Sequence, residues 1–135
     1  VQVLITPTGA ELAGHGPVSA DHAAELSQHA DPTQLTPPTA MKAAYRPDTR
    51  LADWVRARDR HCRFPGCRRP AKTCDLDHLT PWPDGDTTDQ NLACLCRYHH
   101  RLKTHTNWQV RALPGHTLEW TSPRGRTYTT TPEDP

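Results

Sequence analysis

The side chains of this sequence that can do chemistry gather between residues 62 and 105. They form two interleaved sets that suit different ions. The first set, three thiols and an imidazole suited to zinc, comprises Cys62, Cys67, Cys96 and His99. The second set, suited to hydrolysis at a hard cation, comprises Asp77, His78, Asn91 and His100. The sequence therefore indicates one stabilising ion and one reactive site on the same unit.

The spacing of the first set predicts a structural zinc site. Cys62 and Cys67 flank a turn-forming Pro-Gly pair, and Cys96 and His99 are one short step apart at the start of an expected helix. Tetrahedral zinc needs two such pairs that converge on one point. His100 competes with His99 for the fourth position, and the step from Cys96 favours His99. The alternative is that Cys62 and Cys67 are ordinary thiols or a redox pair.

The cysteine count also favours a metal over disulfides. The chain has five cysteines, an odd number, together with nine histidines and no visible export signal. Cys74 and Cys94 have no partner at ligand spacing, so we expect them to be buried core residues.

Three segments, CRFPGC, DLDHLTPWPDGDTTDQNL and LCRYHHRLKTH, together resemble the HNH endonuclease superfamily, also called the ββα-metal nucleases. The resemblance covers roughly residues 54–106 and is densest from 75 to 105. It departs from the pattern at Asp84-Gly85-Asp86, where relatives carry a glycine pair, and at His99, where many carry cysteine. The resemblance also implies that the chain is the C-terminal piece of a longer protein with an upstream domain.

The resemblance assigns a role to each member of the second set. Asp77 and His100 would hold a single divalent cation, Mg²⁺ or Mn²⁺. His78 would be the general base that takes a proton from the attacking water. Asn91 would orient the loop after His78 or complete the metal shell, and His105 is an alternative second metal ligand.

These roles agree with elementary chemistry. A hard cation on a carboxylate and an imidazole can neutralise phosphoryl charge and stabilise the leaving oxygen. A neutral imidazole, with an ordinary pKa of about 6.5, suits proton removal near neutral pH. Neighbours on a regular strand point to opposite faces, so Asp77 and His78 can serve one site only if the strand ends or bulges there.

The charge distribution suggests a polyanionic partner. The net charge is only +1, but basic residues are dense between 50 and 72. On charge alone a solvated surface is the simpler explanation. With the resemblance, we expect DNA contacts that do not read sequence, and the candidate phosphate-contacting residues are Arg60, Arg63, Arg68, Arg69, Arg97, Arg101 and Lys103.

Two helices and a strand are needed to position these residues. The pattern of residues 50–60 predicts a helix capped by Asp48 or Thr49, with Leu51, Trp54 and Val55 on its buried face. A short strand is expected within 73–79, and a helix is expected from near Asn91 to about 104.

The flanking segments are predicted from turn residues and alternation. Residues 1–49 read as an N-terminal arm or linker, with a short strand at its start and a helix capped by Ser19. Residues 107–135 read as a β-strand extension, in which Trp108 and Trp120 pack against the main unit. The predicted fold class is therefore α+β, with a zinc-stapled ββα-metal core at 50–106, an N-terminal helical and loop arm, and a small C-terminal β segment.

Composition limits the size of the core. With 135 residues, a hydrophobic fraction of 34% and 14 prolines, the chain has room for one small core that a bound metal would help to stabilise. No apolar run is long enough to cross a bilayer, so we expect a soluble, cytoplasmic protein with no membrane partner.

We therefore expect a metal-dependent endonuclease that hydrolyses DNA phosphodiester bonds, leaving 5′-phosphate and 3′-hydroxyl ends as the resemblance implies. The expected cofactors are a structural Zn²⁺ and a catalytic Mg²⁺ or Mn²⁺. The main alternative is a catalytically inactive zinc-stabilised module that binds nucleic acid. A second alternative is a zinc-dependent domain that binds another protein.

Overall fold

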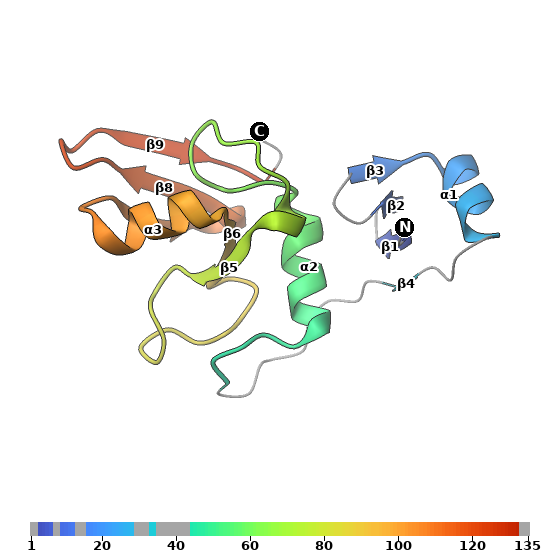
Figure 1. Cartoon of the computed structure of the whole chain (residues 1–135), viewed down its shortest axis with the longest axis horizontal. Helices are drawn as coiled ribbons and strands as arrows, with labels where there is room; N and C mark the ends of the chain where they lie inside the picture. Colours follow the sequence, from blue (N-terminus) through green and yellow to red (C-terminus); the bar gives the residue numbers. More distant parts are fainter. Residues whose placement is uncertain (1–2, 7–8, 13–15, 29–32, 35–43, 133–135) are drawn as a thin grey trace.

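The computed structural model of the chain describes residues 3–6, 9–12, 16–28, 33–34 and 44–132 (Figure 1). These residues form a mixed α+β structure of small sheets and short helices, as the sequence predicts for the class. Within these ranges no helix is long and apolar enough to span a membrane.

The centre of the molecule is a β-hairpin followed by a helix. Strand β5 (Asp75–His78) pairs antiparallel with β6 (Leu92–Leu95), and α3 (Arg97–His105) follows β6 directly. The register pairs Asp77 with Ala93 and His78 with Leu92. A loop of residues 79–91 joins the two strands.

The predicted start of the second helix is wrong. Residues 92–95 are strand β6, and α3 begins only at Arg97 with Cys96 as its N-cap residue. All four residues of β6 are buried, and β6 donates and accepts the ladder hydrogen bonds of β5. A short apolar run such as residues 92–95 is compatible with either a strand or a helix. Pairing with β5 and burial on both faces make it a strand.

Helix α2 (Thr49–Asp59) begins as predicted. The side chain of Asp48 accepts a hydrogen bond of 2.8 Å from the backbone N–H of Leu51, which satisfies one of the free donors at the helix start. Leu51 and Val55 are fully buried, and they pack α2 against β6.

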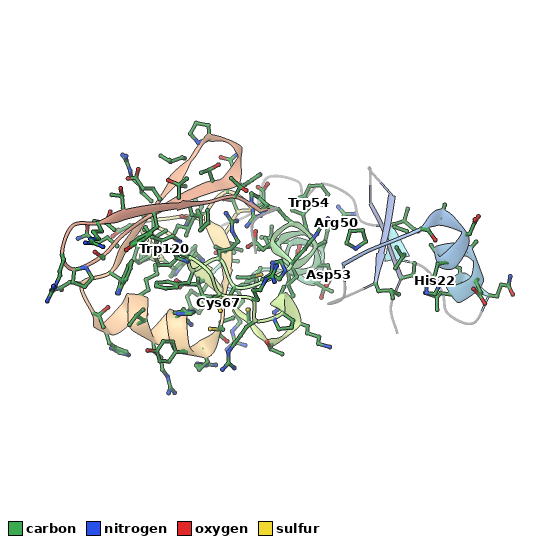
Figure 2. All side chains as sticks on the ribbon, turned by 90° about the horizontal axis from the view of Figure 1, so that it is seen from above. His22, Arg50, Asp53, Trp54, Cys67 and Trp120 are labelled. Atoms are coloured by element: carbon green, nitrogen blue, oxygen red, sulfur yellow. The ribbon has the colours of Figure 1, made fainter. Side chains whose placement is uncertain are left out.

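The predicted role of Trp54 in the core is wrong. Trp54 is only partly buried, because the residues that turn inward are Leu51, Val55 and Asp59, spaced four apart on one face. Figure 2 shows Trp54 on the side of α2 away from Trp120. The buried position nearest the C-terminal end of α2 is therefore occupied by the carboxylate of Asp59, and the indole of Trp54 does not face the core.

The C-terminal sheet shares the core of the central hairpin. Its strands β7 (Gln109–Leu113), β8 (Thr117–Thr121) and β9 (Thr127–Thr130) are predicted as short strands, and they pair in order as an antiparallel meander. Trp120 is fully buried, and Trp108 packs against the same cluster, which confirms their predicted anchoring role.

A buried group of charges joins α2 to β6 and to the C-terminal sheet. Asp59 is 0% exposed and accepts hydrogen bonds from Arg58, from Arg63 and from the backbone N–H of Cys94. Arg63 is 2% exposed and also donates to the carbonyl oxygens of His116 and Thr130. Arg63 therefore holds the fold together, and its predicted role as a phosphate contact is wrong.

The N-terminal residues contain more β-structure than the sequence predicts. A four-stranded sheet has the order β3-β2-β1-β4. Its strands are β1 (Val3–Thr6), β2 (Gly9–Leu12), β3 (Gly16–Val18) and β4 (Thr33–Gln34), and α1 (Ala20–Ser27) lies between β3 and β4 in sequence. Ser19 caps α1 as predicted, by accepting from the N–H of His22. The loop or linker expected at residues 31–48 lies largely outside the described residues, and β4 falls within it.

Candidate metal centre and reactive cluster

Three thiols and an imidazole converge at the start of α3. The ligand atoms of Cys62, Cys67, Cys96 and His99 all lie within 4.8 Å of one another. Nδ1 of His99 lies 3.3 Å from Sγ of Cys96 and 3.5 Å from Sγ of Cys62. The four residues can hold a metal ion, and a Cys₃His donor set is compatible with zinc. His99, and not His100, belongs to this cluster.

Local backbone geometry brings the thiols together. The N–H of Cys67 donates to the carbonyl oxygen of Phe64 at 3.0 Å, which closes a tight turn, and Gly66 has a φ of +76° that favours glycine. The N–H of Cys62 donates to the carbonyl oxygen of Arg69 at 2.8 Å. On the other side, Cys96 is the N-cap of α3, so His99 lies within the first turn of the helix.

An aromatic contact ties the cluster to the core. The ring of Phe64 stacks on the imidazole of His99, with centroids 4.0 Å apart and planes 8° apart. The ring of Phe64 also contacts the ring of Trp120 edge-on, with centroids 5.1 Å apart. Figure 2 shows Cys67, on the same loop as Phe64, in the same part of the molecule as Trp120. The C-terminal sheet thereby fixes the orientation of an imidazole in the cluster.

The pKa values of two thiols of the cluster are raised. A hydrogen bond with the neighbouring Cys74 thiol, together with burial, raises the pKa of Cys62 well above its usual range. Burial also raises the pKa of Cys67, to about 11. Cys74 and Cys94 are buried, as predicted, with Cys74 alongside the cluster but outside it. Binding a metal must therefore displace protons from the thiols.

A second cluster lies on one face of β5, where two aspartates flank an imidazole of α3. Nδ1 of His100 lies 2.8 Å from Oδ2 of Asp75, and its Nε2 lies 3.3 Å from Oδ1 of Asp77. Asp75 and Asp77 share this face because side chains alternate along a strand. A histidine that donates one N–H to a carboxylate presents its other nitrogen as a ligand. Asp77 and His100 thus lie side by side, with Asp75 orienting the imidazole.

One carboxylate oxygen of Asp77 is buried and paired with an ammonium group. This atom, Oδ2, accepts no hydrogen bond from the described residues, although Nζ of Lys103 approaches to 2.7 Å in an ion pair. Lys103 also donates to the carbonyl oxygen of His78 at 3.1 Å. An ammonium next to a buried carboxylate oxygen shows that the position favours positive charge. The ion pair with Lys103 therefore holds the carboxylate of Asp77 next to the imidazole of His100.

His78 makes its side-chain contacts outside this cluster, with Thr87 and Tyr45. It is the last residue of β5 and only 7% exposed, and its Nε2 lies 2.8 Å from Oγ1 of Thr87. The ring of Tyr45 stacks on its imidazole, with centroids 5.6 Å apart and planes 16° apart. Burial lowers the pKa of His78, opposed by Asp77 and reinforced by Lys103. The imidazole is therefore neutral at pH 7.

Asn91 closes the loop that follows His78. Its Oδ1 accepts from the N–H of Thr80 at 2.8 Å, and its Nδ2 donates to the carbonyl oxygens of Thr80 and Asp86 at 2.9 and 2.8 Å. Gly85 makes this arrangement possible, because a Cβ there would collide with the carbonyl oxygen of Thr80 and lie 2.5 Å from Nδ2 of Asn91. The side chain of Asn91 thus orients the loop.

The basic residues differ in accessibility. Those with exposed side chains are Arg68, Arg69, Arg97 and Arg101. Arg60 is partly buried, and Lys103 forms an ion pair with Asp77. His105, the alternative cation ligand, is exposed at the end of α3 and has no contact with either cluster among the described residues. Arg68 and Arg69 lie on the loop of the cysteine cluster, and Arg97 and Arg101 lie on α3.

Three residues that shape these clusters were not found from the sequence. Asp75 had a signal, since it lies two residues before Asp77 and must share its face of a strand. Tyr45 and Thr87 had none, because they are 42 positions apart and meet each other and His78 only through tertiary contacts of irregular segments.

Comparison with known proteins finds relatives of undetermined role. The chain is 45% identical over 133 residues to Rv3776, an uncharacterized protein of Mycobacterium tuberculosis, covering 96% of this chain and 26% of that protein. It is 51% identical over 110 residues to Rv2100, another uncharacterized protein of the same organism, covering 81% of this chain and 19% of that protein. The chain thus spans about a quarter or less of the length of these relatives. No family model matches the sequence, and no solved structure matches it.

Proposed function

We propose that this chain is a metal-dependent endonuclease domain of the HNH (ββα-metal) type that hydrolyses DNA phosphodiester bonds. The observation that carries the proposal is the convergence of Asp77 and His100 from β5 and α3, with Asp75 behind the imidazole. The hairpin and helix that hold them also carry the cysteine cluster, in which zinc is the proposed ion.

In this proposal Asp77 and His100 hold Mg²⁺ or Mn²⁺. When bound, such a cation neutralises charge on the phosphoryl group and stabilises the leaving oxygen. Asp77 supplies a buried carboxylate oxygen that accepts no hydrogen bond among the described residues, and His100 supplies Nε2 because Nδ1 faces Asp75. Lys103 would leave Asp77 when the cation binds and then add positive charge next to the phosphate.

His78 is the proposed general base. Its lowered pKa keeps the imidazole neutral and able to accept a proton from water near neutral pH. The ring lies beneath Tyr45 and is 7% exposed, so bound DNA must move the Tyr45 side chain before water reaches the imidazole. Asn91 keeps the loop after His78 in place through its three hydrogen bonds.

DNA is the proposed partner because exposed arginines lie on the loop and the helix that carry the two clusters. Arg68 and Arg69 lie on the loop of the cysteine cluster, and Arg97 and Arg101 project from α3. Contacts of this kind are made to phosphates, so binding is expected to weaken steeply with salt and to show little sequence preference.

Cleavage of supercoiled plasmid tests the proposal. The zinc-loaded protein is incubated with Mg²⁺, Mn²⁺ or EDTA, alongside His78→Ala and the control His22→Ala, which alters an exposed histidine of α1. We expect nicking that requires a divalent cation, a rate lower by about a hundredfold or more in His78→Ala, and no change in His22→Ala. Nicking that survives EDTA, or that His78→Ala retains, would contradict the assignment.

A second candidate is a zinc-stabilised module that binds nucleic acid without cutting it. The burial of His78 beneath Tyr45 favours this alternative. Salt-sensitive plasmid binding with no nicking under any cation would support it over the nuclease.

A further inference from the structure

The hydroxyl group of Thr87 makes two hydrogen bonds but has one proton. Its Oγ1 lies 3.2 Å from the carbonyl oxygen of Tyr45 and 2.8 Å from Nε2 of His78. A carbonyl oxygen can only accept, so the proton of Thr87 goes to Tyr45. The hydroxyl must then accept from His78, and Nε2 must carry the proton of the neutral ring.

The other ring nitrogen is left as the basic one. Nδ1 of His78 has no hydrogen-bond partner among the described residues, and a neutral imidazole has one donor and one acceptor nitrogen. The ring cannot readily turn over to exchange the two, because Tyr45 stacks on its face and Thr87 is fully buried. The chain of bonds from the Tyr45 carbonyl through Thr87 thus fixes both tautomer and orientation.

We propose that Thr87 is a positioning residue that holds the proton of neutral His78 on Nε2 and leaves Nδ1 to receive the proton of the attacking water. The inference deepens the proposed function and rests on it for the role of Nδ1. It also assigns a role to the segment before α2. The backbone carbonyl oxygen of Tyr45 accepts the hydrogen bond from the Thr87 hydroxyl and so sets the direction of both hydrogen bonds.

The tautomer can be measured without any activity. In ¹⁵N-labelled, zinc-loaded protein at pH 7.5, the two-bond ¹⁵N–¹H correlations of His78 report which nitrogen carries the proton. We expect the Nε2–H form in the wild type and in Thr87→Ser, which keeps a hydroxyl. Thr87→Val removes the acceptor and leaves a buried N–H unpaired, so we expect the population to shift towards Nδ1–H by about tenfold. Thr129→Val, on an exposed position of β9, is the control and should match the wild type.

The outcomes separate this inference from the proposed function. An Nδ1–H form in the wild type, or an unchanged Nε2–H form in Thr87→Val, would overturn the role of Thr87. Where the wild type nicks plasmid, we expect the rate to fall by about tenfold or more in Thr87→Val and to recover in Thr87→Ser, with zinc content unchanged. The expected tautomers in a protein that cuts nothing would uphold the positioning by Thr87 while the nuclease proposal fails.

Discussion

The two clusters on the β5–β6–α3 unit differ in how far they are assembled without an ion. Around Cys62, the thiols and the imidazole of His99 already lie within ligand distance, and no ion pair of the described residues occupies them. Around Asp77, the carboxylate is held by Lys103, and the imidazole of His100 is held between two aspartates.

From this difference we expect the ion of the cysteine cluster to stabilise the fold and the ion proposed at the aspartate cluster to take part in the reaction. The cysteine cluster is packed against Phe64 and the core, so its ion would be retained and would hold the fold. The aspartate cluster is less buried, and its ion pairs must open before a cation binds. Under the proposed function, such a site would exchange its ion and admit a substrate. Changes at the first cluster should therefore alter folding, and changes at the second should alter binding and reaction.

The largest expected effect comes from two adjacent histidines. His99→Ala should lose the metal of the cysteine cluster and much of the stability of residues 49–132, because structural zinc contributes on the order of 10 kcal/mol in small domains. His100→Ala, one residue further along α3, should keep that metal. Zinc content and thermal melting of the two variants check this, and equal zinc loss in both would break the comparison.

Zinc affinity should depend steeply on pH. The raised pKa of Cys67, about 11, means that its thiol is protonated at neutral pH, so each thiolate formed on binding releases a proton. Affinity should therefore fall by at least about tenfold for each unit of decreasing pH. His99, whose pKa is lowered by burial, would not add to this loss until the pH is below 6.5. Competition with a zinc indicator between pH 6 and 8 measures the slope, and a flat profile would contradict the thiol assignment.

The buried charges predict a pure stability effect. Asp59→Ala leaves Arg58 and Arg63 without their carboxylate and should lower the free energy of unfolding by about 3–5 kcal/mol. Asp53→Ala, on the same helix but only partly buried, is the matched control and should change it little. Urea unfolding of the two zinc-loaded variants tests this, and equal stability in both would remove the structural role of Asp59.

A smaller effect is expected from Gly85. In Gly85→Ala the new methyl group meets Thr80 and the amide of Asn91, so the clamp must shift at a cost of about 1–3 kcal/mol. Zinc content should not change, and nicking should slow because the loop after His78 is displaced. Hydrogen exchange of the Thr80 amide reports the clamp directly, and unaltered protection would show that Asn91 tolerates the methyl group.

Sequence reasoning succeeded where chemistry and spacing carry the information. The Cys₃His set, the cap of α2 by Asp48 and the strands of the C-terminal sheet follow from ligand pairs, a capping residue and alternation. A common site for Asp77 and His78 required the strand to end or bulge there, and β5 ends at His78.

Sequence reasoning failed where contacts between residues far apart in the chain determine the local structure or the burial of a side chain. Strand β6 has the same short apolar run as a helix start, and only its pairing with β5 distinguishes the two. Arg63 looks like a surface arginine in the sequence, yet Asp59 four residues earlier and two carbonyl oxygens of the C-terminal sheet draw it inside. No local pattern encodes such partners, and the same holds for Tyr45 and Thr87 around His78.

Manganese binding tests the division into two metal sites most directly. Zinc-loaded wild type and Asp77→Asn would be titrated with Mn²⁺ and followed by electron paramagnetic resonance, with zinc content measured on the same samples. The account predicts one bound Mn²⁺ per wild-type chain, loss of that binding in Asp77→Asn, and the same zinc content in both. Absence of Mn²⁺ binding in the wild type, or loss of zinc in Asp77→Asn, would contradict it.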